Sequence, residues 1–349
     1  MRHLATILLL LLLTISCTTT TIDAPPPYEP DETEAEVQVN SAETAEQQGF
    51  DPDMLAQIPT YVEDRFSHLF SVLVLRNGQL VHEWYAEDVN SETPAVVFSV
   101  TKSVVSTLIG IAIDDGLIAS VDQTLGELIP LQLPVDGDPR TAEVTLRQLL
   151  TMTSGIYCRN DGCHDSSVPE SAARDLEEDP GVTFAYDTGA SHLLSAVLEE
   201  VTGMTTYEYA EQELFDPMNF SGESWDVDAD GVHFGGKGLN LRPRDMAKFG
   251  QLFLNDGQWE GEQLISAEYV AAATTNQLSD TQSTEEYGYL WWPGEVEGYE
   301  TYAAVGYAGQ YVTVVPELEL VVVITSSFWR RHANNNAIIR ELIVPAIVD

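Results

Sequence analysis

At 349 residues, the chain is long enough to bury a sizeable core in one large domain or in two sub-domains. Its 56 acidic and 15 basic side chains give a formal net charge of -41, which repels nucleic acid and anionic membrane surfaces and so excludes functions based on binding them. The acidity is typical of the heavily solvated surfaces of salt-adapted proteins and does not by itself indicate an acid-specific function.

Residues 1–17 predict an export signal. The charged head Arg2-His3 precedes an apolar run at residues 8–13, which is too short to span a membrane, and a small residue stands before Cys17. This end resembles a lipoprotein cleavage site, in which Cys17 would be lipidated; alternatively, the cysteine is discarded with the signal. We expect a periplasmic or cell-envelope protein whose membrane contact is limited to a lipid anchor on Cys17.

Residues 18–48 predict an acidic disordered tether, because proline, aspartate and glutamate are frequent and large apolar side chains are few. Residues 49–349 then form the folded domain. This domain opens with a helix over residues 54–66. A hairpin of two strands, 71–76 and 80–85, follows, and its Asn-Gly turn is the strongest short signal for a hairpin.

Residues 97–113 predict a long apolar helix with two reactive groups at its start, Ser99 and Lys102. Positions three apart share a helix face, so the hydroxyl and the amine can meet. Entry into an apolar segment lowers the pKa of a lysine toward a value useful for proton transfer, and the helix N-terminus favours negative charge near Ser99. The pair predicts a serine nucleophile beside its base, although either residue alone can be ordinary helix surface.

The middle of the chain, from about residue 120 to residue 285, predicts a mostly helical insertion. Its helices are expected after the capping residue Thr145 and over residues 191–201, 206–214, 243–255 and 266–273. Within it, Cys158 and Cys163 flank a short loop. In an oxidising compartment they are a candidate disulfide, and two free thiols are the alternative. A zinc site would need more ligands than His164 supplies, so no metal is expected.

The end of the chain changes to strands. They are expected over residues 287–292, 301–305, 310–315 and 320–325, with a closing helix over 334–347. The last strand is a continuous apolar run suited to a central position. The early hairpin and these strands form one antiparallel sheet flanked by N- and C-terminal helices. Together with the inserted helical region, this predicts an α+β fold.

Separate segments support the catalytic interpretation of the helix start. Ser99 and Lys102, the Thr-Met-Thr-Ser-Gly segment at residues 151–155 and the turn at Tyr186 resemble the penicillin-recognising serine enzymes, specifically their class C β-lactamase-like branch. The resemblance runs from about Ser71 to Ile347. It implies a β-lactamase/transpeptidase-like α/β sandwich. 

Two further segments fit the same branch. Residues 235–250 resemble the glycine-rich wall and helix of its esterase and 6-aminohexanoate-dimer hydrolase-like members. Residues 287–292 are similar to their aromatic segment. The resemblance therefore favours these members of the branch.

The resemblance implies roles for the turn around Tyr186. In this branch the tyrosine is followed two residues later by asparagine, whereas Thr188 stands at that place here. A tyrosinate beside the Lys102 ammonium would relay the proton of Ser99, because an opposite charge favours the ionised form. Thr188 would bind substrate with a shorter reach than asparagine. The alternative for Tyr186 is a buried aromatic side chain that caps the turn.

The third element of the branch is a strand with a Lys-Thr-Gly-like triplet, and the nearest match is Ala304-Val305-Gly306. Its glycine would let a substrate approach the backbone, the amides of Ser99 and Tyr307 would form an oxyanion hole, and Gln310 would contact the substrate. The triplet carries no charge, which argues against carboxylate-bearing substrates. The alternative is a tight hairpin whose glycines serve only the turn.

We therefore expect an exported, monomeric serine hydrolase that cleaves a small ester or amide through an acyl-enzyme on Ser99, without a metal or organic cofactor. A true β-lactamase or DD-peptidase is the enzymatic alternative. A catalytically dead, lipid-tethered binding protein is the alternative from another class. A Ser-His-Asp triad is a rival mechanism, but no Gly-x-Ser-x-Gly elbow surrounds any serine.

Overall fold

The computed structural model describes residues 41–158, 164–278, 281, 283–327 and 336–348. Contacts divide the chain into a unit of Met1–Val37 and a unit of Gln38–Asp349. The predicted export signal and Cys17 lie outside the described residues and stay predictions. Among the described residues, no helix has the length and apolar character needed to cross a membrane.

The last part of the predicted tether is folded. Helix α1 (Ala42–Gln47) begins after Ser41, whose hydroxyl accepts a hydrogen bond from the Thr44 amide, and the Ala45 side chain is buried. The predicted start of the domain at residue 49 is therefore too late, because this short helix is capped and packs on the domain.

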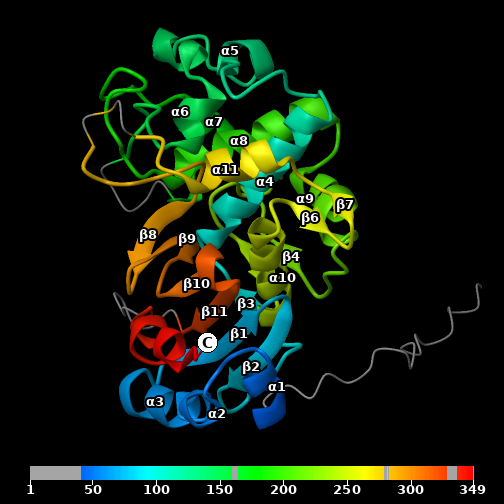
Figure 1. Cartoon of the computed structure of the whole chain (residues 1–349). Coiled ribbons are helices and arrows are strands. Elements are labelled where there is room, and N and C mark those ends of the chain that lie inside the picture. Colours follow the sequence, from blue (N-terminus) through cyan, green and yellow to red (C-terminus); the bar gives the residue numbers. More distant parts are fainter. Residues whose placement is uncertain (1–40, 159–163, 279–280, 282, 328–335, 349) are drawn as a thin grey trace, which may run out of the picture. The chain divides into compact units, whose positions relative to one another are not determined.

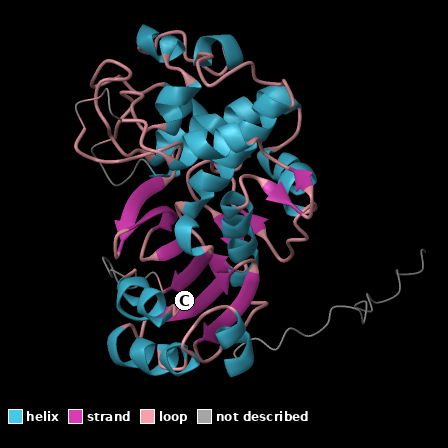
Figure 2. Cartoon of the chain, in the orientation of Figure 1, coloured by secondary structure: helices cyan, strands magenta, loops and turns pink. Residues whose placement is uncertain are grey.

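A six-stranded antiparallel sheet forms the centre of the domain (Figures 1 and 2). Its strand order is β2 (Gln79–Tyr85), β1 (Leu69–Arg76), β11 (Leu320–Ser326), β10 (Gln310–Val315), β9 (Tyr299–Gly306) and β8 (Trp292–Val296). Strands from both ends of the sequence pair directly, since β1 runs antiparallel to β11. Every residue of β11 is buried, as the apolar run predicts for a central strand. The predicted α+β fold is confirmed.

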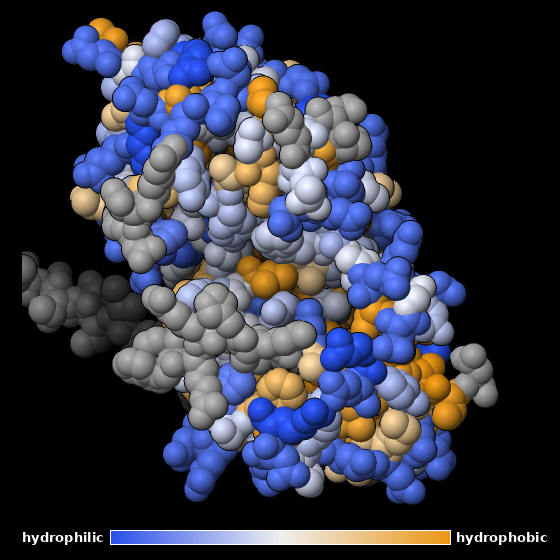
Figure 3. Space-filling model, turned by 90° about the vertical axis from the view of Figure 1, so that its left-hand side faces the viewer, coloured by the Kyte–Doolittle hydropathy of each residue, from blue (hydrophilic) through white to orange (hydrophobic). Residues whose placement is uncertain are grey.

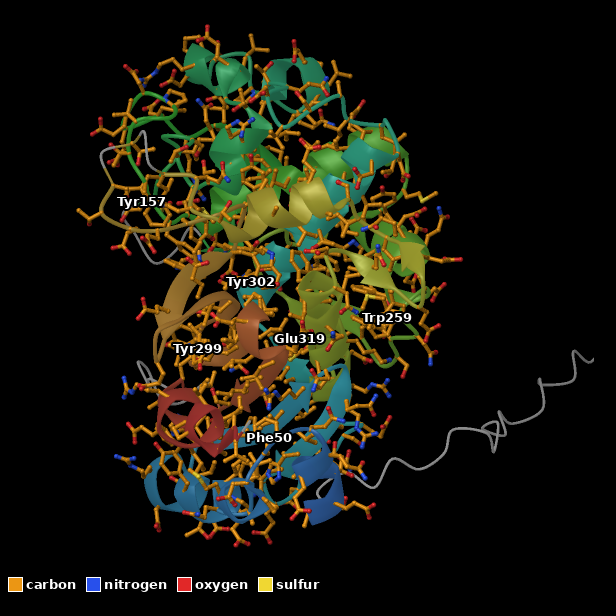
Figure 4. The ribbon with its side chains drawn as sticks, in the orientation of Figure 1. Phe50, Tyr157, Trp259, Tyr299, Tyr302 and Glu319 are labelled. Carbon is orange, nitrogen blue, oxygen red and sulfur yellow. The ribbon has the colours of Figure 1, made fainter. Side chains whose placement is uncertain are left out.

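Helices cover both faces of this sheet (Figure 1). One face carries α2 (Pro52–Leu55), α3 (Ile58–Arg65), the π-helical turn η5 (Ile339–Ile343) and the 3₁₀ turn η6 (Val344–Ala346). Phe50, labelled in Figure 4, packs in the same core as Val322 and Ile324. Their neighbours Val321 and Val323 point to the opposite core, which contains α4 (Val100–Asp114) and α10 (Pro243–Leu254). The sheet therefore separates two hydrophobic cores.

The remaining helices lie between β2 and β8, within the predicted insertion. They are α5 (Leu125–Leu128), η1 (Pro139–Glu143), α6 (Leu146–Leu150), α7 (Val168–Ala172), α8 (Thr188–Thr202), α9 (Thr206–Ala210), η3 (Glu211–Phe215) and α11 (Ala267–Thr274). The short strands are β3 (Ala95–Val96), β4 (Ser224–Trp225), β5 (Leu239–Leu241), β6 (Gln258–Trp259) and β7 (Glu262–Gln263), and η4 (Pro316–Leu318) precedes β11. Helix α4 contacts both α8 and the sheet strands β9 and β10. Its start consequently lies where the helical region meets the sheet.

The predicted strand at residues 287–292 is wrong, because β8 begins only at Trp292. Leu290 has a φ of 61°, a left-handed conformation that interrupts a strand, and its carbonyl accepts a hydrogen bond from the Ser103 hydroxyl of α4. Tyr287 and Trp291 are buried in the core. The aromatic pattern of this segment thus reflects the packing of an irregular loop.

Truncation of Ile324 tests the core between the sheet and the terminal helices. Ile324 is fully buried, so we expect Ile324→Ala to lower the free energy of unfolding by about 2–5 kcal/mol through lost burial and a residual cavity. Urea unfolding followed by circular dichroism measures the change. Val135→Ala is the control, because Val135 is fully exposed and the expected change is below about 0.5 kcal/mol. Equal effects of the two substitutions would contradict the assignment of this core.

Candidate active site

A tight turn at the start of α4 presents Ser99. The Val97 amide donates to the Leu239 carbonyl over 3.1 Å, and Phe98 has a φ of 48°, which is uncommon for a residue other than glycine. The Thr101 hydroxyl donates to the Phe98 carbonyl over 2.6 Å and accepts from the Leu239 amide over 3.3 Å. Ser99 is therefore held at a helix N-terminus by a strained but well-anchored turn, a feature that is common at functional sites.

The side chain of Lys102 is 1% exposed and reaches back to Ser99. Its Nζ donates hydrogen bonds to Ser99 Oγ (3.0 Å), to Thr188 Oγ1 (3.1 Å) and to the carbonyl oxygen of Gly236 (2.7 Å). Burial lowers the pKa of this amine to about 7, against the opposing effect of the Asp187 carboxylate. The three-residue spacing thus brings the hydroxyl and the amine together, and the amine exchanges its proton near neutral pH.

Helix α8 supplies the Thr188 acceptor at its first residue. Its N-cap, Asp187, is buried and accepts hydrogen bonds from the first turn of the helix, from the Cys158 amide (2.9 Å) and from the Arg174 guanidinium (3.0 Å). These donors fix the start of the helix, so Thr188 lies against Lys102. The structure thereby gives Thr188 a partner in the site, while its predicted contact with substrate stays a prediction.

Tyr186 directly precedes this helix cap, and its ring centroid lies 4.9 Å from Lys102 Nζ. The backbone N–H of the residue before Tyr186 donates to the Met152 carbonyl (2.8 Å). The backbone N–H of the residue after Tyr186 donates to the Met152 sulfur (3.5 Å). Burial raises the pKa of Tyr186 to about 12, although a hydrogen bond with Ser99 acts in the opposite direction. The phenol is protonated at neutral pH, in contrast to the expected tyrosinate, because desolvation of the phenolate outweighs its stabilisation by neighbours.

The pair Gly235-Gly236 supplies the third acceptor and packs closely on α8. A Cβ on Gly236 would lie 2.7 Å from the Thr188 carbonyl oxygen, and a Cβ on Gly235 would lie 2.6 Å from that of Ser191. Glycine is therefore required for this backbone to approach the helix and reach Lys102. The sequence pattern indicated a glycine-rich wall here but carried no signal for a hydrogen bond to the lysine.

His192 lies one turn after Thr188 on α8 and is buried. Its Nδ1 accepts the Gly235 amide over 3.0 Å, and its Nε2 lies 3.0 Å from Asp228 Oδ2. Both ring nitrogens are thus engaged by groups other than Ser99. The nearest histidine to the tyrosine turn therefore does not serve as the base of a Ser-His-Asp triad.

The end of strand β9 lies against the Ser99 turn. A Cβ on Gly306 would lie 2.2 Å from the Val97 carbonyl oxygen, so the strand approaches this closely because the residue is glycine. The rings of Tyr307 and Phe98 meet edge to face with centroids 5.5 Å apart. Tyr307 is thereby placed beside the turn that holds Ser99, and the oxyanion role of its amide stays a prediction.

Gln310 is fully buried at the start of β10. Its Nε2 donates to the Ser326 carbonyl over 2.8 Å, and its Oε1 accepts the Ser326 amide over 3.0 Å. The side chain thus extends the pairing of β10 with β11 beyond the backbone ladder. The structure thereby gives the buried amide of Gln310 partners within the sheet, and its predicted contact with substrate stays a prediction.

A cavity of about 610 Å³ opens beside Tyr186, within the range of small-molecule sites. It is lined by Gly155, Tyr157, Glu177, Glu178, Thr183, Phe184, Ala185, Tyr186, Ser283, Thr284 and Glu285. Tyr157 is labelled on the left in Figure 4, and Figure 3 turns that side toward the viewer. Hydrophilic residues cover most of this face, in keeping with the net charge of -41.

Cys158 is disulfide-bonded. Cys163 lies outside the described residues, so its pairing with Cys158 stays a prediction. Within the part of the chain that the structure describes, no group of three His, Cys, Asp or Glu side chains is arranged to hold a metal ion.

The sheet, the serine and lysine at the start of α4 and the tyrosine turn define a hydrolase of the β-lactamase/transpeptidase-like fold. The Beta-lactamase family model matches residues 62–343, and the chain belongs to this family. It is 25% identical over 305 residues to the 6-aminohexanoate-dimer hydrolase of Paenarthrobacter ureafaciens, covering 79% of this chain and 76% of that protein.

Solved structures agree in fold. A proposed β-lactamase from Bacteroides dorei superposes with a TM-score of 0.71 at 19% identity, covering 85% of this chain and 99% of that one. A proposed 6-aminohexanoate-dimer hydrolase from Bacillus anthracis superposes with a TM-score of 0.69 at 20% identity, covering 82% and 80%. At these identities the comparison establishes the architecture, and the chemistry must be argued from the side chains.

The pH dependence of stability tests the depressed pKa of Lys102. The folded-state pKa of about 7 lies below the ordinary value of 10.5, so the unfolded state binds more protons between these values and stability rises with pH. Relative to Lys102→Met, the wild-type free energy of unfolding should increase by about 1.4 kcal/mol per pH unit from pH 7 to pH 10. Urea unfolding at several pH values measures this. Lys248→Met, at a partly exposed position, is the control, and a pH-independent difference for Lys102→Met would contradict the assignment.

Proposed function

We propose that this protein is a serine hydrolase that forms an acyl-enzyme on Ser99. The proposal is carried by the Lys102 amine, which lies 3.0 Å from Ser99 Oγ and has a pKa of about 7. Near neutral pH, much of this amine is unprotonated and can accept the serine proton. Membership of the Beta-lactamase family supports the same class of reaction.

In the proposed first step, Ser99 Oγ attacks the substrate carbonyl carbon while Lys102 Nζ takes the hydroxyl proton. The backbone N–H groups of Ser99 and Tyr307 stabilise the negative charge on the tetrahedral intermediate. Collapse of the intermediate breaks the ester or amide bond, and the Lys102 ammonium returns the proton to the leaving group. Water then attacks the acyl-enzyme with the same amine as base, which releases the acid and restores Ser99.

Tyr186 acts in this scheme as a neutral phenol. Its raised pKa keeps the proton on the oxygen, and its ring lies 4.9 Å from Lys102 Nζ, which supports a place for the phenol beside the reacting atoms. The phenol therefore donates a hydrogen bond to the reacting oxygens and relays a proton between Lys102 and the leaving group. Tyr186→Phe should slow acylation without abolishing it.

We propose a small ester or amide as the substrate. Ala304 stands where the branch carries a cationic residue, and it is uncharged and fully buried, which argues against substrates anchored by a carboxylate. The name of the Paenarthrobacter relative supports a linear amide as one candidate. A β-lactam or a peptidoglycan peptide is the alternative, supported by the family name.

The proposed location is the periplasm or cell envelope, with Cys17 as the lipid attachment site. The charged head and apolar run of residues 1–17 support this proposal. The protein is proposed to act as a monomer on a small-molecule substrate.

Labelling with a fluorophosphonate probe tests the nucleophile. We expect stoichiometric labelling of the wild type, none of Ser99→Ala, and unchanged labelling of Ser91→Ala, which alters a half-buried serine outside the site. Peptide mass spectrometry locates the adduct. A folded wild type that stays unlabelled would contradict the hydrolase proposal and favour a non-catalytic binding protein.

Nitrocefin and p-nitrophenyl esters assayed in parallel rank the substrate classes, and faster nitrocefin turnover would contradict the preference for esters and linear amides.

The pH profile of labelling tests the base. The acidic limb should lie near pH 7, because Lys102 must be unprotonated to accept the serine proton. Lys102→Ala should lower the labelling rate by about 10²–10⁴-fold and remove this limb. Stopped-flow or gel-based rates between pH 5 and pH 9 measure both effects, and a limb that persists in Lys102→Ala would assign the base elsewhere.

A further inference from the structure

We infer that Asp228 and His192 are positioning residues for the base. They hold the Gly235-Gly236 backbone in the orientation in which the Gly236 carbonyl oxygen binds the Lys102 amine. The inference rests on the proposed function, in which Lys102 takes the serine proton. It extends the site to two residues that the serine, tyrosine and glycine motifs do not contain.

The hydrogen bonds around Asp228 determine which nitrogen of His192 carries the proton. Asp228 Oδ1 accepts from two backbone N–H groups of the turn that follows it, each at 2.9 Å. Its Oδ2 accepts from the Val168 amide (3.2 Å) and meets His192 Nε2 (3.0 Å). Burial raises the pKa of Asp228, but the hydrogen bonds from His192 and the turn bring it below its usual value. An ionised carboxylate only accepts, so Nε2 donates and Nδ1 is left as an acceptor.

This tautomer suits the glycine pair. The Gly235 N–H donates to His192 Nδ1 over 3.0 Å, and the carbonyl of the following residue, Gly236, accepts from Lys102 over 2.7 Å. Thr188 and His192 are four residues apart and share one face of α8. That face therefore binds the lysine directly through Thr188 and indirectly through His192 and the glycine backbone.

The surroundings keep His192 neutral. Its ring is 1% exposed and packs on Phe234 with centroids 5.2 Å apart. Burial lowers its pKa, against the raising effect of Asp228, and Glu199 is a further charged group near that carboxylate. A second proton would put an N–H on Nδ1 opposite the Gly235 N–H. The neutral form is thus the one that holds the glycine pair.

Three substitutions separate the two hydrogen bonds of the imidazole. His192→Asn keeps an acceptor near the Nδ1 position, whereas His192→Gln keeps a donor near the Nε2 position and loses that acceptor. Asp228→Asn presents an amide N–H to Nε2, which moves the imidazole proton to Nδ1, against the Gly235 N–H. The charged groups that act on Lys102, Asp187 and Lys237, are unchanged in all three.

A purely structural role of His192 and Asp228 would leave the pKa of Lys102 unchanged, so this pKa is the readout that tests the inference. The chain has three lysines, Lys102, Lys237 and Lys248, so an NMR titration of protein labelled with ¹³C,¹⁵N-lysine resolves them, and Lys102→Met assigns the signal. We expect the pKa of Lys102 to fall by about one unit in His192→Gln and Asp228→Asn, because the ammonium loses an acceptor. It should stay at the wild-type value in His192→Asn.

Fluorophosphonate labelling provides the kinetic readout. At high pH, where the amine is unprotonated, the rate should fall by about 10²-fold in His192→Gln and Asp228→Asn, because the base is misplaced. Their acidic limb should move to lower pH with the pKa of Lys102. His192→Asn should retain a rate close to that of the wild type.

The outcomes distinguish this inference from the proposed function. An unchanged Lys102 pKa and labelling rate in both His192→Gln and Asp228→Asn would overturn the inference and leave the hydrolase intact. An unlabelled wild type would overturn the hydrolase, while the lysine titration would still decide the positioning. If neither variant folds, the ¹⁵N shifts of His192 in the wild type decide: a proton on Nε2 supports the inference, and a proton on Nδ1 overturns it.

Discussion

The burial of one amine constrains the arrangement of the whole site. A lysine that loses its water needs hydrogen-bond acceptors inside the protein, and Lys102 finds them on Ser99, Thr188 and Gly236. These acceptors come from α4, α8 and a glycine-rich loop, segments separated by up to 134 positions in the chain. These contacts around Lys102 therefore form only when α4, α8 and the glycine-rich loop have packed together.

A separate structural feature holds each of the three acceptors of Lys102 in place. A positive φ at Phe98 and the Thr101 hydroxyl hold the serine turn, the buried Asp187 caps α8, and two glycines let a loop approach that helix. Burial lowers the pKa of the amine to about 7, although the Asp187 carboxylate acts in the opposite direction. The three acceptors are neutral oxygens and carry no full charge that would keep the amine protonated, which supports the proposed role of Lys102 as the base.

Thr188 and Ala304 depart from the pattern of the class C β-lactamase-like branch, and the structure shows the surroundings of both residues. Thr188 stands where the branch pattern has asparagine, and its hydroxyl oxygen accepts a hydrogen bond from Lys102 over 3.1 Å. Ala304 is buried in the sheet and presents no charge, in keeping with the proposed preference for substrates without a carboxylate. The residues of the proposed proton transfer, Ser99 and Lys102, are thus in contact, and both differences lie at positions where the branch pattern implies substrate recognition.

The sequence by itself determined what depends on neighbours within a few residues. The Asn-Gly hairpin, the buried strand β11 and the meeting of Ser99 with Lys102 follow from turn chemistry, apolar runs and helical spacing. Only the tertiary structure decided the protonated state of Tyr186, the irregular loop before β8, and the contacts of Gly236, His192 and Gln310. Desolvation and long-range hydrogen bonds depend on segments that are distant in sequence, and no local pattern records which of them will meet.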